Sequence, residues 1–126
     1  KIKKILEIFN SNNSRTSLVI NPSIQDIKLS KTRGSKCIEI HTGKISNKIK
    51  EKKNYSRELN KIKKCAIYAQ KIGLEVHAGH GMDYKTTKIL NKIKQIEEFN
   101  IGHFIIGESV SHSISKVVKQ FIKILR

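Results

Sequence analysis

The sequence predicts an α/β fold in which four parallel strands alternate with helices. Two observations support this prediction. Short runs rich in β-forming residues alternate with segments whose apolar residues recur at helical spacing, and turn residues separate the two kinds of segment. Strands that alternate with helices form a parallel sheet joined by right-handed crossovers. The 126 residues suffice for one small domain with a core.

The N-terminal part of the chain is expected to contain two helices and two strands. A polar turn follows the first helix, and Pro22 lies where the first strand ends. Ser23 then provides an oxygen that can cap the second helix, and Gly34 breaks the chain before the second strand. The expected elements are a helix over 1–10, a strand over 15–20, a short helix over 23–29 and a strand over 36–40.

The rest of the chain continues the alternation. Residues 42–54 are so rich in lysine that we expect a loop that does not pack. The clearest helix covers 56–72 and ends at Gly73. Its expected apolar face consists of Leu59, Ile62, Ala66, Ile67 and Ala69. The further elements are a strand over 74–78, a helix over 84–93, a strand over 99–101 and a helix over 114–125.

The position of the fourth strand has two interpretations. Periodicity alone cannot distinguish 99–101 from 104–106, because both are short apolar runs. We favour a strand that ends at Ile101, followed by a helix that Gly102 and His103 open. This choice puts both residues at the carboxyl end of the strand, where ligands bind in such folds.

Residues that could carry chemistry follow the ends of three expected strands. Glu39 lies between two isoleucines of the second strand, so its side chain should face away from theirs. His80 lies between two glycines after the third strand, and Gly102 and His103 follow the fourth. The carboxyl ends of parallel strands meet at one edge, so we expect one site. An imidazole titrates near neutral pH and can move protons, whereas the backbone N–H groups of Gly81 and Gly102 can approach an anion.

The other histidines have open interpretations. His41 is either a support of the site or a loop residue, and His77 either lines the barrel interior or is a buried hydrogen-bonded residue. His112 is expected on the surface of a helix. His77 and His80 are three residues apart, but no cysteine pair or third nearby ligand completes a tetrahedral set, so we expect no metal.

The net charge of +16 also has two interpretations. A basic chain can bind nucleic acid or an anionic membrane. The basic residues are mostly lysines interspersed with Ile and Asn, and there is no Trp to stack on bases, so we expect no specific nucleic acid and no membrane as partners. Cys37 and Cys65 are expected to be buried thiols. Together with the lack of a signal peptide or a membrane-spanning run, this predicts a cytoplasmic protein.

Four strand–helix units are half of an eight-unit barrel, which has about 250 residues. A half barrel leaves two sheet edges unpaired, and the chain starts at Lys1 rather than at a methionine. We therefore expect further N-terminal residues or a partner chain. The alternative to a catalytic function is a basic half-barrel that binds polyanions or a partner chain.

Three stretches, in this order, resemble the pyridoxine 5′-phosphate synthase family. They are Ile-Glu-Ile-His-Thr-Gly at 38–43, Glu-Val-His-Ala-Gly-His-Gly-Met at 75–82 and Asn-Ile-Gly-His-Phe-Ile-Ile-Gly at 100–107. The resemblance covers nearly the whole chain, but only the C-terminal half of that family's TIM (β/α)8 barrel. It implies that residues 1–126 form a partial TIM-barrel domain, strand–helix units five to eight, of a homo-oligomeric enzyme.

The resemblance implies a ring-closing condensation of vitamin B6 biosynthesis. Family members condense 1-deoxy-D-xylulose 5-phosphate with 3-amino-2-oxopropyl phosphate, without a cofactor, to give pyridoxine 5′-phosphate, phosphate and water. By motif, His80 matches the proton donor and Glu39 the carboxylate that stabilises charged intermediates. Gly81, Gly102 and His103 match the positions that hold the aminooxopropyl phosphate.

Two departures from the family pattern affect this expectation. The family's other histidine base, a glutamate and a phosphate-binding arginine belong to units one to four, so the chain alone is expected to be inactive. Glu108 stands where the family usually carries a basic residue, which weakens the expected phosphate field.

Overall fold

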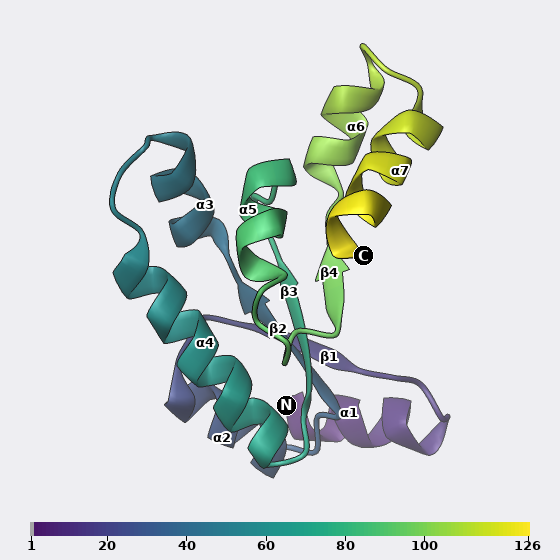
Figure 1. Ribbon diagram of the computed structural model, residues 1–126. Helices are drawn as coiled ribbons and strands as arrows, with labels where there is room; N and C mark the ends of the chain where they lie inside the picture. Colours follow the sequence, from purple (N-terminus) through teal and green to yellow (C-terminus); the bar gives the residue numbers. More distant parts are fainter. Residues whose placement is uncertain (1) are drawn as a thin grey trace.

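A computed structural model describes residues 2–126 of the chain. One sheet of four parallel strands, in the order β1-β2-β3-β4, organises the molecule (Figure 1). The strands alternate with helices along the chain. The predicted α/β class is therefore confirmed, and the arrangement corresponds to half of a TIM barrel.

The predicted strands and helices are present, with ends that differ by a few residues. The first half contains α1 (Ile2–Ser11), β1 (Ser17–Ile20), α2 (Ile24–Thr32), β2 (Cys37–His41) and α3 (Gly43–Lys50). The second half contains α4 (Ser56–Lys71), β3 (Glu75–Gly79), α5 (Tyr84–Leu90), β4 (Glu98–Asn100), α6 (His103–Ser109) and α7 (Ile114–Leu125). Lys1, with which the predicted first helix begins, lies outside the described residues.

The lysine-rich loop predicted over 42–54 is wrong, because α3 occupies most of it. Ile45 and Ile49 lie one helical turn apart, and both are buried in the core. Two isoleucines suffice to hold this amphipathic helix on the molecule while its lysines face solvent. Local composition missed α3 because packing against the later helices α4 and α5 stabilises it.

Two finer predictions can also be decided. On α4 the buried residues include Cys65, whereas Ile67 is 45% exposed, so its assignment to the apolar face is wrong. Ile67 lies about 200° around the helix from Cys65, so the two residues cannot share one face. The favoured interpretation, a fourth strand before Gly102 followed by a helix, is confirmed, since β4 ends at Asn100 and α6 begins at His103. The alternative strand over 104–106 is wrong.

The apolar core lies between one face of the sheet and helices α2 to α5. Ile38 and Ile40 of β2 and Val76 and Ala78 of β3 are fully buried in it. Leu90 of α5 closes the core from the helical side. Since side chains alternate along a strand, the intervening residues of β2 and β3 must face the opposite side of the sheet.

This opposite face is polar. Its rows of paired residues run across the strands, with Glu39 of β2 beside His77 of β3 and then Glu98 of β4. The last row joins the strand ends His41, Gly79 and Asn100. The candidate site described below is built from this face, the loops that follow it and the ends of α3 and α6.

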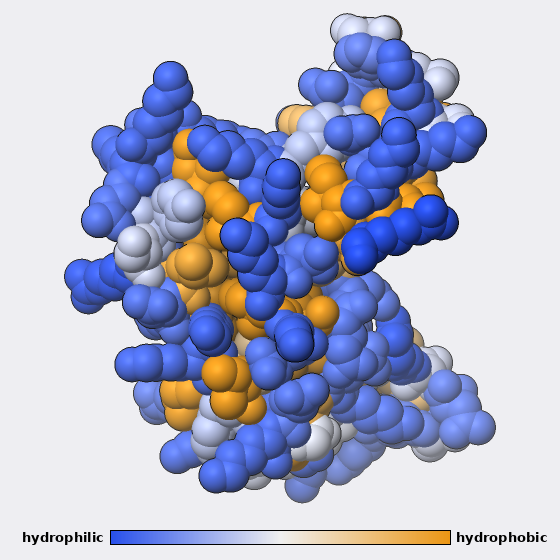
Figure 2. Space-filling view, in the orientation of Figure 1, coloured by the Kyte–Doolittle hydropathy of each residue, from blue (hydrophilic) through white to orange (hydrophobic). Residues whose placement is uncertain are grey.

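The first and last helices expose apolar side chains. Most of the surface in Figure 2 is hydrophilic, with apolar patches that include one in the region of α7. The exposed apolar residues of α1 are Ile2, Ile5, Ile8 and Phe9, and those of α7 are Ile114, Val118, Ile122 and Leu125. Val19 of the edge strand β1 is 63% exposed on the polar face.

Candidate functional site

The carboxyl ends of β2, β3 and β4 meet at one edge of the sheet, as the parallel topology requires. Of the predicted residues, His80, Gly81, Gly102 and His103 follow the ends of β3 and β4, whereas Glu39 lies two residues before the end of β2. The strand ends are in register, because His41 pairs with Gly79 and Gly79 with Asn100.

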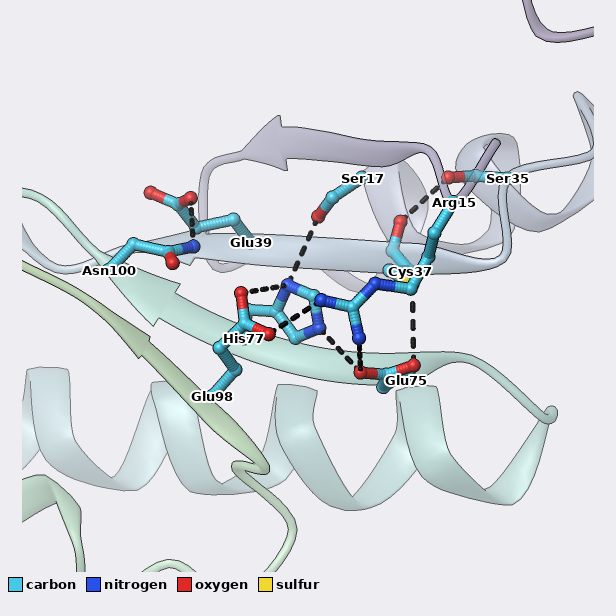
Figure 3. Close-up of polar contacts among 9 residues, drawn as sticks. All are labelled: Arg15, Ser17, Ser35, Cys37, Glu39, Glu75, His77, Glu98 and Asn100. Carbon is cyan, nitrogen blue, oxygen red and sulfur yellow. Dashed lines mark hydrogen bonds and ion pairs between the residues drawn. The ribbon is translucent and has the colours of Figure 1, made fainter. Parts of the chain in front are cut away.

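Glu39 projects onto the polar face of the sheet, because its neighbours Ile38 and Ile40 are both buried in the core. Its Oε2 atom accepts a hydrogen bond of 2.7 Å from Asn100 Nδ2 (Figure 3). Gly79, which pairs with Asn100 in the register, leaves the room that the carboxylate occupies, since a Cβ atom there would overlap Glu39 Oε1. A carboxylate held in this way can stabilise a developing positive charge.

His80 follows β3 in a left-handed backbone conformation, with φ at +79°. This conformation costs a non-glycine residue about 1–2 kcal/mol, and it lifts the imidazole out of the sheet into solvent. The His41 ring stacks on the His80 ring with centroids 4.2 Å apart and an interplanar angle of 26°. Of the two interpretations of His41, support of the site therefore fits, because its ring limits where the His80 ring can lie.

A cleft of about 410 Å³ opens beside His80. Its lining comprises Lys50, His80, Gly81, Met82, Asn100, Ile101, Gly102, His103 and Phe104. Gly102 precedes α6 without a side-chain cap, and a Cβ atom at this position would meet nothing within 4 Å. Two glycines, two imidazoles and one lysine thus line a single hollow, and backbone N–H groups, imidazoles and ammonium groups are donors that can bind a phosphate.

Glu39 does not itself line this cleft but reaches it through Asn100, which does. The sequence prediction missed the two polar lining residues Lys50 and Asn100. Lys50 lay in the segment predicted as a loop, and Asn100 was counted only as a strand residue. The proximity of Asn100 to Gly102 at a strand end was a signal that could have found it.

Glu108, where a basic residue was expected, lies away from the cleft. It contributes to a different hollow, together with Tyr84, His112 and Lys116. Burial of the Tyr84 hydroxyl, and then the nearby Glu108 carboxylate, raise the pKa of Tyr84. His112 is exposed as predicted, but it lies between α6 and α7 rather than in a helix.

A second polar cluster lies on the same face of the sheet, toward the amino ends of the strands (Figure 3). Arg15 donates to Glu75 at 2.8 Å and to Glu98 at 2.6 Å. His77 Nε2 lies 2.9 Å from Glu75 Oε1, and His77 Nδ1 lies 3.7 Å from Glu98 Oε1. The hydrogen bond with His77 lowers the pKa of Glu75, and burial raises the pKa of the Cys37 thiol to about 11.

This cluster bears on two expectations from the sequence, that no metal binds and that His77 either lines the barrel interior or is a buried hydrogen-bonded residue. Cys37, Glu75 and His77 offer ligand atoms that all lie within 4.8 Å of one another. Those atoms already bond to each other, because Glu75 accepts from Cys37 at 3.5 Å as well as from His77 and Arg15. A cation would have to displace Arg15, so the donor set fits an ion network better than a metal centre. His77, 1% exposed, is both part of the sheet's polar face and a buried hydrogen-bonded residue.

Comparison with known proteins decides the family. A family model described as pyridoxal phosphate biosynthesis protein PdxJ matches residues 1–126. The chain belongs to this family. The pyridoxine 5′-phosphate synthase of Pelagibacter ubique (strain HTCC1062) is 58% identical over 124 residues, which cover 98% of this chain and 52% of that relative.

Other relatives in this family give the same picture. The pyridoxine 5′-phosphate synthase of Sulfurihydrogenibium sp. (strain YO3AOP1) is 44% identical over 109 residues, which cover 86% of this chain and 44% of the relative. The chain spans about half the length of the curated relatives it matches. Among residues 2–126, no helix combines the length and apolar character needed to cross a bilayer.

Proposed function

We propose that residues 1–126 are strand–helix units five to eight of a pyridoxine 5′-phosphate synthase. The enzyme would condense 1-deoxy-D-xylulose 5-phosphate with 3-amino-2-oxopropyl phosphate. The observation that carries this proposal is the arrangement at one sheet edge, where His80, Gly81, Gly102 and His103 share a cleft and Glu39 lies one hydrogen bond away. Relatives that are named pyridoxine 5′-phosphate synthase support this proposal.

In this proposal His80 is the proton donor. Imine formation, dehydration and ring closure require protons to be delivered and removed repeatedly, and an exposed imidazole at the mouth of the cleft can do both. The Glu39 carboxylate offsets the positive charge of an iminium intermediate. Asn100 holds this carboxylate at 2.7 Å, so that it need not reorganise when the charge develops.

The aminooxopropyl phosphate would bind between the turn at Gly81 and the start of α6. Gly102 and Gly81 offer backbone N–H groups, His103 offers a ring N–H donor, and Lys50 supplies a positively charged ammonium group. Lys50 provides charge that the family obtains from the position of Glu108. Because Glu108 belongs to another hollow, it leaves the phosphate field of the cleft largely unaffected.

The exposed apolar faces of α1 and α7 and the edge strands β1 and β4 would contact the units that complete the barrel. Those units would supply the remaining catalytic groups, so residues 1–126 alone would not turn over. A homo-oligomeric state and the lack of a cofactor stay predictions from the family resemblance, and a cytoplasmic location stays a prediction from the sequence.

Histidine variants of the full-length protein test the proposal. His80→Ala should lower the kcat of pyridoxine 5′-phosphate formation by about 10²–10⁴-fold, the usual effect of losing a general acid. His112→Ala is the matched control, since this exposed histidine lies outside the cleft, and it should keep the parent rate. Parent-level activity of His80→Ala would refute the assignment.

The alternative function, polyanion binding, predicts tight binding to nucleic acid and no synthase activity. A protein whose function is to bind polyanions would hold a DNA duplex at physiological salt, and its affinity would fall steeply as salt is raised. We expect only weak binding, because the lysines are dispersed and the chain has no tryptophan. Tight, salt-sensitive binding together with no synthase activity in the full-length protein would favour the alternative.

A further inference from the structure

Thr42 lies at the N-cap position directly before α3, but its hydroxyl does not cap the helix. Ser23, Asp83 and Ser113 occupy the same position before α2, α5 and α7, and each accepts a hydrogen bond from the backbone N–H three residues on. A threonine at this position normally does the same. The Thr42 hydroxyl is therefore engaged elsewhere, although its use as a cap would stabilise α3.

The hydroxyl instead holds the turn that carries His80. Thr42 Oγ1 lies 2.8 Å from the carbonyl oxygen of Gly79 and 2.8 Å from that of His80, and one proton is shared between these two acceptors. The Thr42 backbone N–H also donates to Gly79 O at 2.8 Å. Thr42 thus binds both peptide oxygens that flank the left-handed residue.

The position of Thr42 is itself fixed by packing. Its side chain is fully buried, and Ser46 Oγ donates to its carbonyl oxygen at 3.0 Å. The next residue, Gly43, supports the stacked histidines, because a Cβ atom there would lie 2.7 Å from the His41 ring and 3.0 Å from the His80 ring. The loop from His41 to Gly43 therefore fits closely around His80 from two sides.

We propose that Thr42 is a positioning residue that holds His80 in its left-handed conformation over the cleft. The proposal rests on the proposed function of His80 as proton donor. Without the hydroxyl, the carbonyl oxygens of Gly79 and His80 each lose a donor, and the strained backbone of His80 relaxes. The imidazole then leaves the orientation in which it can reach a substrate in the cleft, and misplacement by about 1 Å can cost about 100-fold in rate.

Three variants of the full-length enzyme test this role. Thr42→Val replaces the hydroxyl by a methyl group of the same shape, and it should lower kcat by about 10- to 100-fold with little change in KM. Thr42→Ser keeps the hydroxyl and should retain a kcat within about threefold of the parent. If Thr42→Val does not fold, Thr42→Ala removes the hydroxyl without adding bulk and should show the same loss.

A double-mutant cycle separates positioning from a general structural role. If Thr42 acts through His80, then Thr42→Val should cause no further loss of kcat in a His80→Ala background. A loss of the same size in both backgrounds would overturn the proposal. So would parent-like activity of Thr42→Val, or an equal loss in Thr42→Val and Thr42→Ser.

A measurement independent of activity keeps this inference distinct from the proposed function. Backbone ¹³C chemical shifts of His80 report its φ angle, and they should leave the left-handed range in Thr42→Val but not in Thr42→Ser. Unchanged chemical shifts of His80 in Thr42→Val would refute the proposal that Thr42 holds the His80 turn, even if activity fell. A parent-like His80→Ala variant would refute only the catalytic assignment, because the shift measurement would still test whether Thr42 holds the turn.

Discussion

Gly79→Ala should separate activity from stability in the full-length enzyme. The added Cβ atom would overlap Glu39 Oε1 and lie 2.7 Å from Glu39 Cδ and 3.2 Å from Asn100 Cβ. Ordinary contacts begin at 3.4 Å, so the carboxyl carbon must move by at least about 0.7 Å, the difference between these distances. A shift approaching 1 Å in a charge-stabilising group costs up to about 100-fold in rate, and we expect kcat to fall by about 10- to 100-fold.

Stability should change little, because the clash is with the flexible end of Glu39 rather than with backbone. The added methyl group also reduces the entropy of the unfolded chain, which favours folding by about 0.4–1 kcal/mol. The assay compares kcat at saturating substrates with the thermal midpoint of the same preparation. Gly107→Ala is the matched control, since a Cβ atom there meets nothing within 4 Å, and it should keep the parent kcat. A parent-like kcat in Gly79→Ala would show that the reaction does not depend on this position of Glu39.

Three further predictions concern the same face and the core behind it. Asn100→Leu removes the donor to Glu39 and should lower kcat by about 10- to 100-fold, since a hydrogen bond to a charged group contributes about 1.5–3 kcal/mol. Steady-state kinetics measure this change, and a kcat within twofold of the parent value would contradict the prediction. Ile40→Ala empties a fully buried position and should lower the free energy of unfolding by about 2–5 kcal/mol, measured by urea denaturation; a loss below about 1 kcal/mol would contradict the observed packing. The Cys37 thiol, with its pKa raised from 9.0 to about 11 by burial, binds its proton more tightly in the folded state, so stability should fall as the pH rises from 9.0 toward 11. Cys37→Ser should flatten this part of the pH–stability curve, and an unchanged slope would refute the assignment.

The acid side of the pH–stability curve depends on Glu75. Its pKa lies below 4.5 because His77 and then Cys37 donate hydrogen bonds to its ionised form. A lowered pKa means that the unfolded chain binds more protons than the folded chain in this range, so stability is present above pH 4.5 and is lost below it. Glu75→Gln should make acid unfolding less steep, as followed by circular dichroism. An identical acid transition in the variant would indicate that this carboxylate contributes nothing to it.

The alternation of apolar and polar residues, together with the positions of turn residues, was enough to predict the sheet and the direction of the Glu39 side chain. Ile38 and Ile40 are buried in the core, so Glu39 had to face the other side, and the structure agrees. Gly102 marked the boundary between β4 and α6 correctly. These predictions succeeded because they depend on local rules of strand period and turn chemistry, which tertiary packing did not override.

The helix α3 could not be predicted in the same way, and it determines much of the candidate site. Ile45 and Ile49 are buried in the core, and α3 packs against α4 and α5, which follow it in the sequence. No local pattern reports these contacts. Because α3 forms, Thr42 lies directly before its first residue and reaches the turn at His80, while Lys50 at its other end lines the cleft. A lysine-rich loop in its place would fix neither group. The packing that places both groups therefore involves residues outside the matching motifs. Thr42 itself lies in the motif at 38–43, but the motif alone does not show that its hydroxyl contacts the turn at His80.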